Sequence, residues 1–287
     1  MQKSTRIVGA AILVLAALSI LIWYAAWLED RHALLTVSFL DIGQGDSIFI
    51  QAPSGTQVLI DGGPGSTVMR RLSQVMPWYD HSLDVIIPTH PDADHISGLI
   101  DVLKRYQISY VLQSSVLGST PTWNSLEGAI ADDAKSGTKV ITAERGRIIN
   151  LGKGAYLEIL SPDRELLKTD TNTACVVTHL VYGKTSFMLG CDAPQMIENY
   201  LVSLDGKNLK SDVLKAGHHG SRTSSSPLWV GYVDPSYAVY SRGCDNKYGH
   251  PHAETIATFA RFNIPTEDTC KLGTITFVSD GNTVRLK

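Results

Sequence analysis

The apolar positions of the chain form one long uninterrupted run, followed by a series of short runs. Residues 7–28 carry no charge and are mostly apolar. A run of this length can cross a bilayer as a helix, which needs roughly 20 residues. A cleaved secretory signal and a buried core helix are the alternatives, but a signal has an apolar core of only about 7–15 residues. We therefore predict an uncleaved cytoplasmic stub and transmembrane anchor over residues 1–32.

The charges that flank this run predict how it is oriented in the membrane. Lys3 and Arg6 precede the run, and the next charges along the chain are Glu29 and Asp30. Positive charges near a spanning helix favour the cytoplasmic side. We therefore expect a single-pass protein of the cell membrane, with a cytoplasmic N-terminus and residues 33–287 outside the cytoplasm.

The short runs that follow the anchor are typical of strands. The segments LLTVSFLDIG, DSIFIQAP and TQVLIDGG are rich in β-forming residues and bounded by Gly, Pro or Asp. The segment LDVIIPTH, residues 83–90, is nearly continuously apolar, as in a strand covered on both faces. Apolar residues at helical spacing then follow, namely Ile96, Leu99, Ile100 and Leu103.

The second half of the chain also combines strand-like and helical segments. Strand-like segments such as AYLEILSP, TSFMLGCD and SDVLKAGHH alternate with helical ones such as APQMIENYLVSL. Two β-rich halves, each interrupted by helices and joined without a linker, predict one domain built as a sandwich of sheets with helices outside. Residues 112–150 show weak patterning, and we expect them to include long loops near the site.

Composition and charge narrow the function. With 44% hydrophobic and 18% charged residues, the 287-residue chain is folded rather than disordered. Its net charge of −3 provides no global basic field, so a nucleic-acid contact must rest on a local patch or on bound metal. The four cysteines lack CxxC spacing, which disfavours a zinc knuckle. Buried unpaired thiols are slightly favoured over disulfides.

The candidate chemistry begins at the end of the apolar strand. The pattern H-x-D-x-D-H places four potential ligands, His90, Asp92, Asp94 and His95, within six positions. One ion cannot accept four side chains from so tight a loop, but two divalent ions can share them. Two such ions can clamp the attacking and leaving oxygens of a phosphoryl displacement.

Further ligands stand at the ends of two other predicted strands. Asp192 ends FMLGCD, and His218 and His219 end DVLKAGHH. A helix cap is the alternative role for Asp192, and one histidine of the pair is expected to be structural. Three apolar strands that each end in Asp or His side chains indicate one composite metal site.

The motifs resemble those of a known family. The segments THPDADHISGL, GCD and LKAGHHGS resemble the motifs of the metallo-β-lactamase fold superfamily. More narrowly, FLDIGQGDSIFI, VLIDGG, SDVLKAGHHGSRTSSSP and NKYGHPH resemble the extracellular hydrolase domain of the ComEC/Rec2 family of DNA-uptake (competence) proteins, over about residues 35–285. The resemblance implies an α/β fold, a four-layer αβ/βα sandwich, with the site at one edge of the sheets.

The resemblance also implies a ligand set for two divalent metal ions. His90 and Asp92 would bind the first ion, and Asp94 and His95 the second. Asp192 would bridge the ions, and His218 would complete the shell of the second. Asn172 stands where the superfamily commonly has a further histidine. The oxygen-rich set favours Mn²⁺, with Zn²⁺ as the alternative.

Other matched residues receive supporting roles. Asp61 would orient a loop or ligand, as would His219. Asp94 could hold the attacking water, and Lys215 or His250 could stabilise charge on the leaving side. Ser221, Arg222 and Tyr248 are candidates for substrate contact.

Two charged groups leave alternatives open. Lys207, Lys210, Lys215 and Arg222, against Asp212, form a local basic excess that could attract a phosphate backbone, or a solvated charged face. Asp41 and Asp46, which flank the glycines of DIGQGD, are expected to form a turn.

We therefore expect a membrane-anchored, outward-facing metal-dependent hydrolase. By resemblance, it is a nuclease that cleaves DNA, single-stranded or one strand of an incoming duplex, in connection with DNA uptake and beside a separate DNA-channel protein. One alternative is a metallo-hydrolase of small molecules, such as nucleotide phosphodiesters or lactones. The other is a non-catalytic DNA-binding or assembly module.

Overall fold

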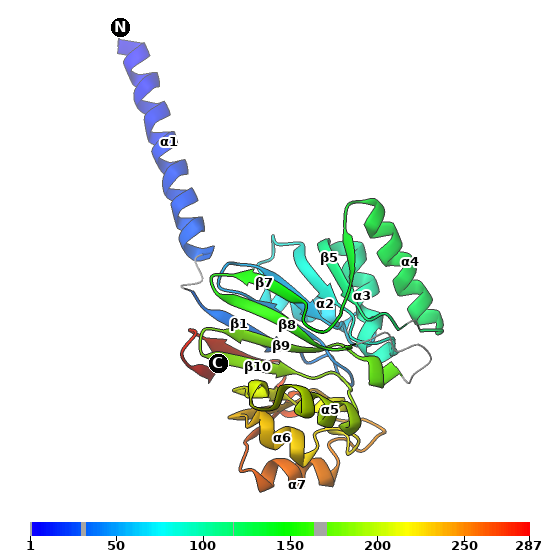
Figure 1. The fold of residues 1–287 in the computed structure, drawn as a ribbon. Helices are drawn as coiled ribbons and strands as arrows, with labels where there is room; N and C mark the ends of the chain where they lie inside the picture. The colour runs from blue at the N-terminus through cyan, green and yellow to red at the C-terminus, as the bar shows by residue number, and fades with distance from the viewer. Residues whose placement is uncertain (1, 30–32, 117, 164–170) are drawn as a thin grey trace. The chain divides into compact units, whose positions relative to one another are not determined.

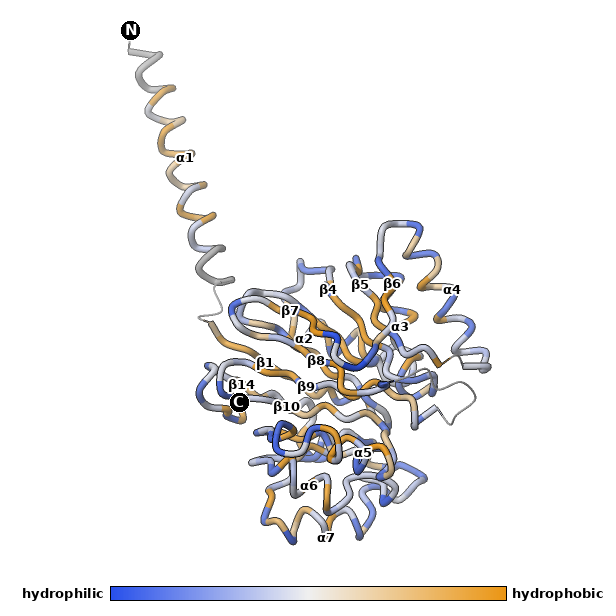
Figure 2. Tube along the Cα trace, viewed as in Figure 1, coloured by the Kyte–Doolittle hydropathy of each residue, from blue (hydrophilic) through white to orange (hydrophobic). Residues whose placement is uncertain are grey.

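The computed structural model describes residues 2–29, 33–116, 118–163 and 171–287, which belong to two units, residues 1–33 and 34–287. The first unit consists of helix α1, Gln2–Glu29. Its segment Ile7–Tyr24, with a mean hydropathy of 2.5, is by length and composition a candidate membrane span. Apolar residues recur throughout this segment (Figure 2).

The second unit contains two mixed sheets. The first has eight strands in the order β15-β14-β1-β2-β3-β4-β5-β6. Its strands are β1 (Leu35–Phe39), β2 (Ile48–Gln51), β3 (Gln57–Ile60), β4 (Ser82–Ile87), β5 (Gln107–Gln113), β6 (Lys139–Thr142), β14 (Ile275–Ser279) and β15 (Val284–Leu286).

The second sheet has seven strands in the order β13-β12-β11-β10-β9-β8-β7. Its strands are β7 (Ile148–Gly152), β8 (Ala155–Ser161), β9 (Val177–Tyr182), β10 (Thr185–Leu189), β11 (Val213–Lys215), β12 (Tyr237–Tyr240) and β13 (Thr266–Asp268).

Helices cover the outer face of each sheet (Figure 1). The first sheet carries α2 (Thr67–Val75), α3 (Ala93–Arg105) and α4 (Pro121–Lys135), and the second carries α5 (Gln195–Asp205), α6 (Pro227–Val233) and α7 (Ala253–Arg261). The remaining short helices are α8 (Thr269–Leu272) and the 3₁₀ turns Thr171–Ala174, Gly206–Leu209 and Gly217–Gly220.

The strands alternate between two apolar environments because successive side chains point to opposite faces of a sheet. On β3, Val58 and Ile60 lie in the core between the sheets, while Leu59 lies in the core beneath the helices. On β11, Val213 and Leu214 divide in the same way. Each fully buried side chain of this size contributes about 1.5–3 kcal/mol to the free energy of unfolding. This four-layer αβ/βα sandwich confirms the predicted fold class.

The strand directions bring the candidate residues to one edge. Strands β3, β4, β5 and β6 are parallel, and β1 shares their direction because it is antiparallel to β2, which is antiparallel to β3. In the second sheet β10, β11 and β12 are parallel. The carboxyl ends of these strands therefore carry the loops in which ligand sites of layered α/β folds are found.

The prediction of long loops over residues 112–150 is wrong. This segment contains helix α4 and strands β6 and β7. Thr120 caps α4 by accepting a hydrogen bond from the backbone N–H of Trp123, and Pro121 occupies the first turn. Only three side chains of α4, Trp123, Leu126 and Ile130, are buried, so its apolar pattern is weak.

The slight preference for unpaired thiols is also wrong. The structure contains the disulfides Cys175–Cys191 and Cys244–Cys270, with Cα atoms 6.2 and 4.9 Å apart. Cys175 precedes β9 and Cys191 follows its antiparallel partner β10, so strand pairing brings them together. This pairing depends on strand register, which cysteine spacing alone does not give.

Candidate metal centre

The ligand-rich loop joins strand β4 to helix α3. His90 follows the strand, Asp92 is the N-cap position of α3, and Asp94 and His95 lie in its first turn. The imidazoles of His90 and His95 are buried, with ring centroids 4.0 Å apart, whereas both aspartates are partly exposed. The loop therefore presents two rings inward and two carboxylates towards the mouth of the site.

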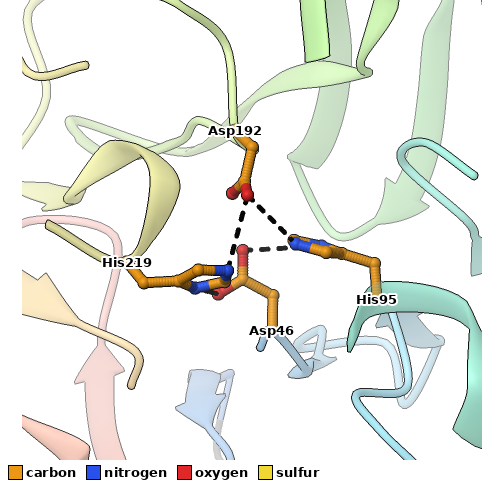
Figure 3. A group of neighbouring side chains, drawn as sticks. All are labelled: Asp46, His95, Asp192 and His219. Atoms are coloured by element: carbon orange, nitrogen blue, oxygen red, sulfur yellow. Dashed lines mark ion pairs between the residues drawn. The ribbon is translucent and has the colours of Figure 1, made fainter. Parts of the chain in front are cut away.

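Four buried residues from distant parts of the chain meet beside this loop. Asp46, His95, Asp192 and His219 each offer one ligand atom, and these atoms lie within 4.8 Å of one another (Figure 3). The Nε2 atoms of His95 and His219 are 3.3 and 3.4 Å from Oδ2 of Asp192. We call these four residues the acid–histidine cluster.

In both histidines of the cluster, a polar group outside the cluster holds the Nδ1 atom. His219 donates through Nδ1 to the backbone oxygen of Ser241 at 2.9 Å, and Nδ1 of His95 lies 2.8 Å from Oδ2 of Asp61. Within the described chain, the buried Nε2 atoms of both rings have no hydrogen-bond partner. Histidines that bind metals show this arrangement, with one nitrogen held and the other facing the ion. The residues present therefore fit a divalent ion.

Asp61 holds a second ring through Thr89. Thr89 donates its backbone N–H and its hydroxyl to the two oxygens of Asp61, at 2.8 and 2.7 Å. Its hydroxyl oxygen lies 2.9 Å from Nδ1 of His90, and the buried Nε2 of His90 is also without a partner in the described residues. One carboxylate thus orients both imidazoles of the loop, and this geometry fits the role predicted for Asp61.

Asp46 enters the cluster through an unusually close backbone approach. Its N–H donates to the backbone oxygen of Asp94 at 3.3 Å. The preceding Gly45 has φ +126, and a Cβ there would stand 2.0 Å from the same oxygen. Only glycine allows this approach. The sequence prediction gave Asp46 to a turn, and the structure adds it to the site.

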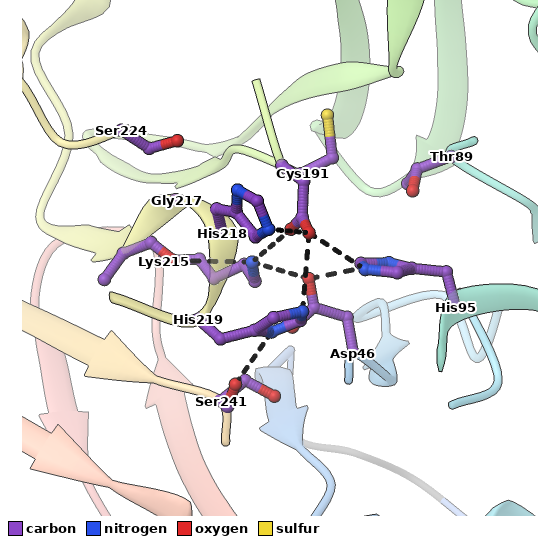
Figure 4. Close-up of polar contacts among 12 residues, drawn as sticks. Asp46, Thr89, His95, Cys191, Lys215, Gly217, His218, His219, Ser224 and Ser241 are labelled. Atoms are coloured by element: carbon purple, nitrogen blue, oxygen red, sulfur yellow. Dashed lines mark hydrogen bonds and ion pairs between the residues drawn. The ribbon is translucent and has the colours of Figure 1, made fainter. Parts of the chain in front are cut away.

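Lys215 lies beneath the cluster rather than at its mouth. Its side chain is 1% exposed, and Nζ is 2.5 Å from Oδ2 of Asp46 (Figure 4). Burial would raise the pKa of Asp46, but Lys215 and His219 outweigh it and hold that pKa well below its usual range. Lys215 thus neutralises a buried carboxylate. This placement contradicts its predicted role beside the leaving group, because the ammonium does not face solvent.

The two neighbouring histidines occupy different places from those predicted. His218 and His219 have φ values of 48 and 55, in the left-handed region that β-carbon-bearing residues rarely adopt. This kink turns His219 into the cluster and leaves the side chain of His218 29% exposed at the rim. Nε2 of His218 is 3.5 Å from Oδ2 of Asp192. The predicted ligand His218 and the predicted supporting residue His219 therefore exchange positions.

The remaining predicted ligands are Asp92, Asn172 and Asp94. Oδ2 of Asp92 is 3.7 Å from Nε2 of His90, and its Oδ1 accepts a hydrogen bond from the Thr171 hydroxyl at 3.0 Å. The adjacent Asn172 has a buried Oδ1 that no described group satisfies. Oδ2 of Asp94 lies 3.4 Å from Nε2 of His219.

The charged groups of the cluster shift one another's pKa values towards the ionised forms. Burial lowers the pKa of His95 and His219, but Asp192 and the other carboxylates outweigh burial and raise both pKa values well above 6.5. At His90, burial and the neighbouring charge of His95 outweigh the carboxylates and lower the pKa to about 3. In the metal-free protein at neutral pH, His90 is therefore neutral, whereas a proton competes with metal for His95 and His219.

The rim carries His250 and Tyr248. The His250 ring lies 5.7 Å from that of His218, and Tyr248 stacks on it at 5.5 Å with half of its surface exposed. Burial, with the nearby histidines, lowers the pKa of His250 to about 4. His250 is thus neutral at pH 7, so any charge it stabilises would be stabilised through a hydrogen bond.

The predicted basic excess is mostly neutralised. Lys210 pairs with Asp234 at 2.5 Å, Arg222 with Glu254 at 3.4 Å, and Lys215 is buried. Ser221 is also buried, and its hydroxyl oxygen accepts hydrogen bonds from Thr223. Of the predicted substrate contacts, only Tyr248 and Arg222 are exposed.

One known protein family matches this chain over most of the domain. The family model of the metallo-beta-lactamase superfamily matches residues 40–243. Among curated proteins, ComE operon protein 3 of Bacillus subtilis is 28% identical over 84% of this chain and 32% of its own length. Competence protein ComA of Neisseria gonorrhoeae is 29% identical over 77% of this chain and 29% of its own length. The chain is homologous to competence proteins and spans about a third of their length.

Solved structures share the fold at low identity. A metallo hydrolase from Ignicoccus hospitalis is 12% identical, with a TM-score of 0.54 over 84% of this chain and 98% of its own. CmlA, a diiron β-hydroxylase from Streptomyces venezuelae, is 14% identical, with a TM-score of 0.54 over 82% of this chain and 52% of its own. At 12% and 14% identity, these likenesses concern the fold alone.

Proposed function

The chain belongs to the metallo-β-lactamase superfamily, and from that premise we propose that it is a membrane-anchored nuclease that cleaves DNA outside the cytoplasm in connection with DNA uptake. The superfamily and the buried cluster make it a metal-dependent hydrolase. Its relatives among competence proteins support DNA as the substrate. DNA and a separate DNA-channel protein are the proposed partners.

The observation that carries the proposal is the convergence of unpartnered Nε2 atoms on buried carboxylates. We assign His95, Asp94, Asp192 and His219 to one divalent ion, with Asp46 beside them. We assign His90 and Asp92 to a second ion, with Asp192 shared and His218 beside Asp192. Asn172 follows Thr171, whose hydroxyl donates to Asp92. The oxygen-rich second set favours Mn²⁺, with Zn²⁺ as the alternative. A bound divalent ion supplies Lewis acidity for phosphodiester hydrolysis.

The residues of the chain itself position the reactants. Asp94 is the partly exposed carboxylate between the cluster and solvent, so we assign it the orientation of the attacking water. Neutral His250 can donate a hydrogen bond to a substrate oxygen at the rim, and the exposed ring of Tyr248 can stack on a base. Lys215 balances the charge of Asp46 from below.

The anchor assignment rests on α1. Its apolar window and the charges Lys3 and Arg6 favour a single span with a cytoplasmic N-terminus. The paired cysteines favour the same side for the domain, because disulfides persist in oxidising compartments.

A hydrolase of small phosphodiesters or lactones is the second candidate. The observation that favours it is the neutralised basic excess around the site, where Lys210 and Arg222 are ion-paired. A DNA strand would find few free cations there among the described residues.

Substrate assays with the full chain separate the two candidates. We expect the protein with added Mn²⁺ to digest linear or circular DNA, single-stranded or duplex. The rate of cleavage by Asp94→Asn should be at least 100-fold lower. Asp280→Asn, in an exposed turn far along the sequence, is the matched control. Turnover of a small phosphodiester or lactone with no DNA cleavage would favour the second candidate. Full activity of Asp94→Asn would contradict the assigned site.

A further inference from the structure

The edge of the first sheet opposite the metal centre carries an open groove. Strands β1, β3, β4, β5 and β6 all begin at this edge, whereas the metal centre lies where β3 and β4 end. A groove of about 1650 Å³ runs along the starts of β4, β5 and β6. None of its lining residues belongs to the proposed active site.

An aromatic turn stands beside this groove. In the segment Pro77–Asp80 the N–H of Asp80 donates to the backbone oxygen of Pro77 at 3.0 Å, which closes the turn. The turn presents Trp78 at 85% exposure and Tyr79 at 53% exposure, with their rings in edge contact at 5.7 Å. A large aromatic pair held out into water marks a surface that something else covers. Trp and Tyr are the side chains preferred at a membrane–water interface.

The groove itself is positively charged. Its charged lining residues are Arg70, Lys104, Arg105 and Lys139 against Asp80 and Asp133. Both carboxylates are already engaged inside the domain, because Asp80 accepts hydrogen bonds from Gln57 and Ser82, and Asp133 from Thr138. Lys104 also lies 4.0 Å from Asp101, with most of its side chain exposed. The four cations still outnumber the two carboxylates of the lining, and basic residues near an anionic lipid surface strengthen binding to it.

The chain also enters the domain at this edge. Five residues, 30–34, lie between the end of α1 at Glu29 and the start of β1 at Leu35. With α1 in a bilayer, the start of β1 is the part of the domain tethered to the membrane surface. The aromatic turn and the basic groove share the edge at which β1 starts.

We infer that this edge docks on an anionic lipid surface, with Trp78 and Tyr79 at the interface and Arg70, Lys104 and Arg105 facing lipid headgroups. The inference rests on the proposed membrane anchoring. It gives the anchored domain a defined orientation, in which the metal centre faces away from the bilayer and is open to a substrate arriving from outside.

The test uses the full chain in vesicles with brominated acyl chains, which quench only nearby tryptophans. Trp23 and Trp27 are first replaced by Phe, and Trp123 and Trp229 are buried, so Trp78 is the remaining exposed indole. The fluorescence of Trp78 is taken as the difference between this chain and the same chain with Trp78→Phe, because buried Trp123 and Trp229 also fluoresce. In vesicles that contain phosphatidylglycerol, we expect at least twofold quenching of this difference. In phosphatidylcholine vesicles, the quenching should fall by half or more.

A charge variant and its control complete the design. Replacing Arg70, Lys104 and Arg105 together by Gln should reduce the quenching to the phosphatidylcholine level. Arg261→Gln, an exposed position on α7, should leave it unchanged. Equal quenching in both lipids, or none, overturns the inference. So does protection of Trp78 by an oligonucleotide or by a second copy of the chain instead of by lipid.

Flotation separates this inference from the proposed function. A chain that floats with the vesicles but shows no quenching of Trp78 is anchored without docking, so only the inference fails. A chain that does not float lacks the anchor, and both fail. DNA cleavage by the charge variant should equal that of the unmodified chain, because the three cations lie at the other edge of the sheet from the metal centre.

Discussion

The orientation of two histidine rings depends on a single buried carboxylate. Oδ2 of Asp61 lies within hydrogen-bond distance of Nδ1 of His95. The Thr89 hydroxyl donates to the same carboxylate and contacts Nδ1 of His90, so it links Asp61 to the second ring. Asp61 itself is held at φ 58 after the end of β3. A ring free to rotate would spend part of its time with Nε2 turned away from an ion, so the carboxylate acts on metal affinity without touching metal.

Replacing Asp61 by Asn should weaken Mn²⁺ binding by about 10–100-fold, because the amide cannot accept from both partners as the carboxylate does. Thr89→Val removes only the link to His90 and should have a smaller effect. Isothermal titration calorimetry of the two variants measures the difference. An unchanged dissociation constant in Asp61→Asn would show that the rings are held by packing alone.

The neighbouring histidines allow a paired comparison at one turn. His219→Ala removes a ring that meets Asp94 and Asp192 inside the cluster, and it should abolish binding of one metal equivalent. His218→Ala removes a partly exposed ring and should retain most of that equivalent. Metal content by mass spectrometry decides between them, and the reverse order would restore the ligand set first predicted.

At the scale of elements, strong periodicity predicted structure well and weak periodicity did not. The apolar strand β4 and the helix α3 after it follow directly from their residues, and so does the ligand loop between them. Helix α4 was missed because few of its side chains are buried. Asp46 was missed because its place depends on how the loop before β2 approaches the start of α3, a contact between distant segments. The exchange of His218 and His219 arises from a left-handed kink that spacing does not encode.

Helix α5 braces the kinked turn that carries these histidines. Glu198 on α5 accepts hydrogen bonds from the backbone N–H groups of Ser225 and Ser226, at 2.6 and 2.8 Å. The Ser225 hydroxyl in turn accepts from the N–H of Gly217, which begins the turn. The strained backbone is therefore supported by a buried carboxylate outside the metal centre.

Glu198 should make stability depend on pH. Burial raises its pKa from 4.5 to about 7, so its contribution is fully present below about 4.5 and is lost as pH rises through about 7. The loss amounts to about 3 kcal/mol. In Glu198→Gln the fall in stability between pH 5 and pH 8 should shrink by this amount, leaving the part due to His95 and His219, and in the exposed control Glu254→Gln it should keep its full size. Urea unfolding at pH 5 and pH 8 measures it, and equal pH dependence of the free energy of unfolding in all three proteins would contradict the assignment.

At the scale of the whole domain, a disulfide joins the residue before Asp192 to the segment that precedes β9. Cys191 precedes Asp192, and its disulfide to Cys175 closes a loop with a sequence separation of 16. Reduction of this bond should cost about 3 kcal/mol in the free energy of unfolding. Cys175→Ala with Cys191→Ala should also weaken metal binding, whereas the matched pair Cys244→Ala with Cys270→Ala should not. Metal affinity equal in both double variants would separate the disulfide from the site.

The acid–histidine cluster links the folding of the domain to both pH and metal. In the metal-free chain the pKa values of Asp46 and Asp192 are lowered, so their contribution to stability is present above pH 3.8 and is lost as pH falls. The pKa values of His95 and His219 are raised, so their contribution is present below pH 6.5 and is lost as pH rises through the raised values. The cluster therefore contributes most to the stability of the metal-free domain between these limits.

Metal binding should have the opposite pH dependence above pH 6.5. An ion at the cluster needs neutral imidazoles, so binding releases protons and strengthens as pH rises. The thermal midpoint of the metal-free chain should fall between pH 6.5 and pH 9, while the stabilisation produced by a fixed excess of Mn²⁺ should grow over the same range. Comparing the two states of one chain cancels the contribution of Glu198, which lies outside the cluster. Titrations in buffers of different ionisation enthalpy give the proton count directly. Stabilisation by Mn²⁺ that is independent of pH, with no proton released, would place the metal elsewhere than at His95 and His219.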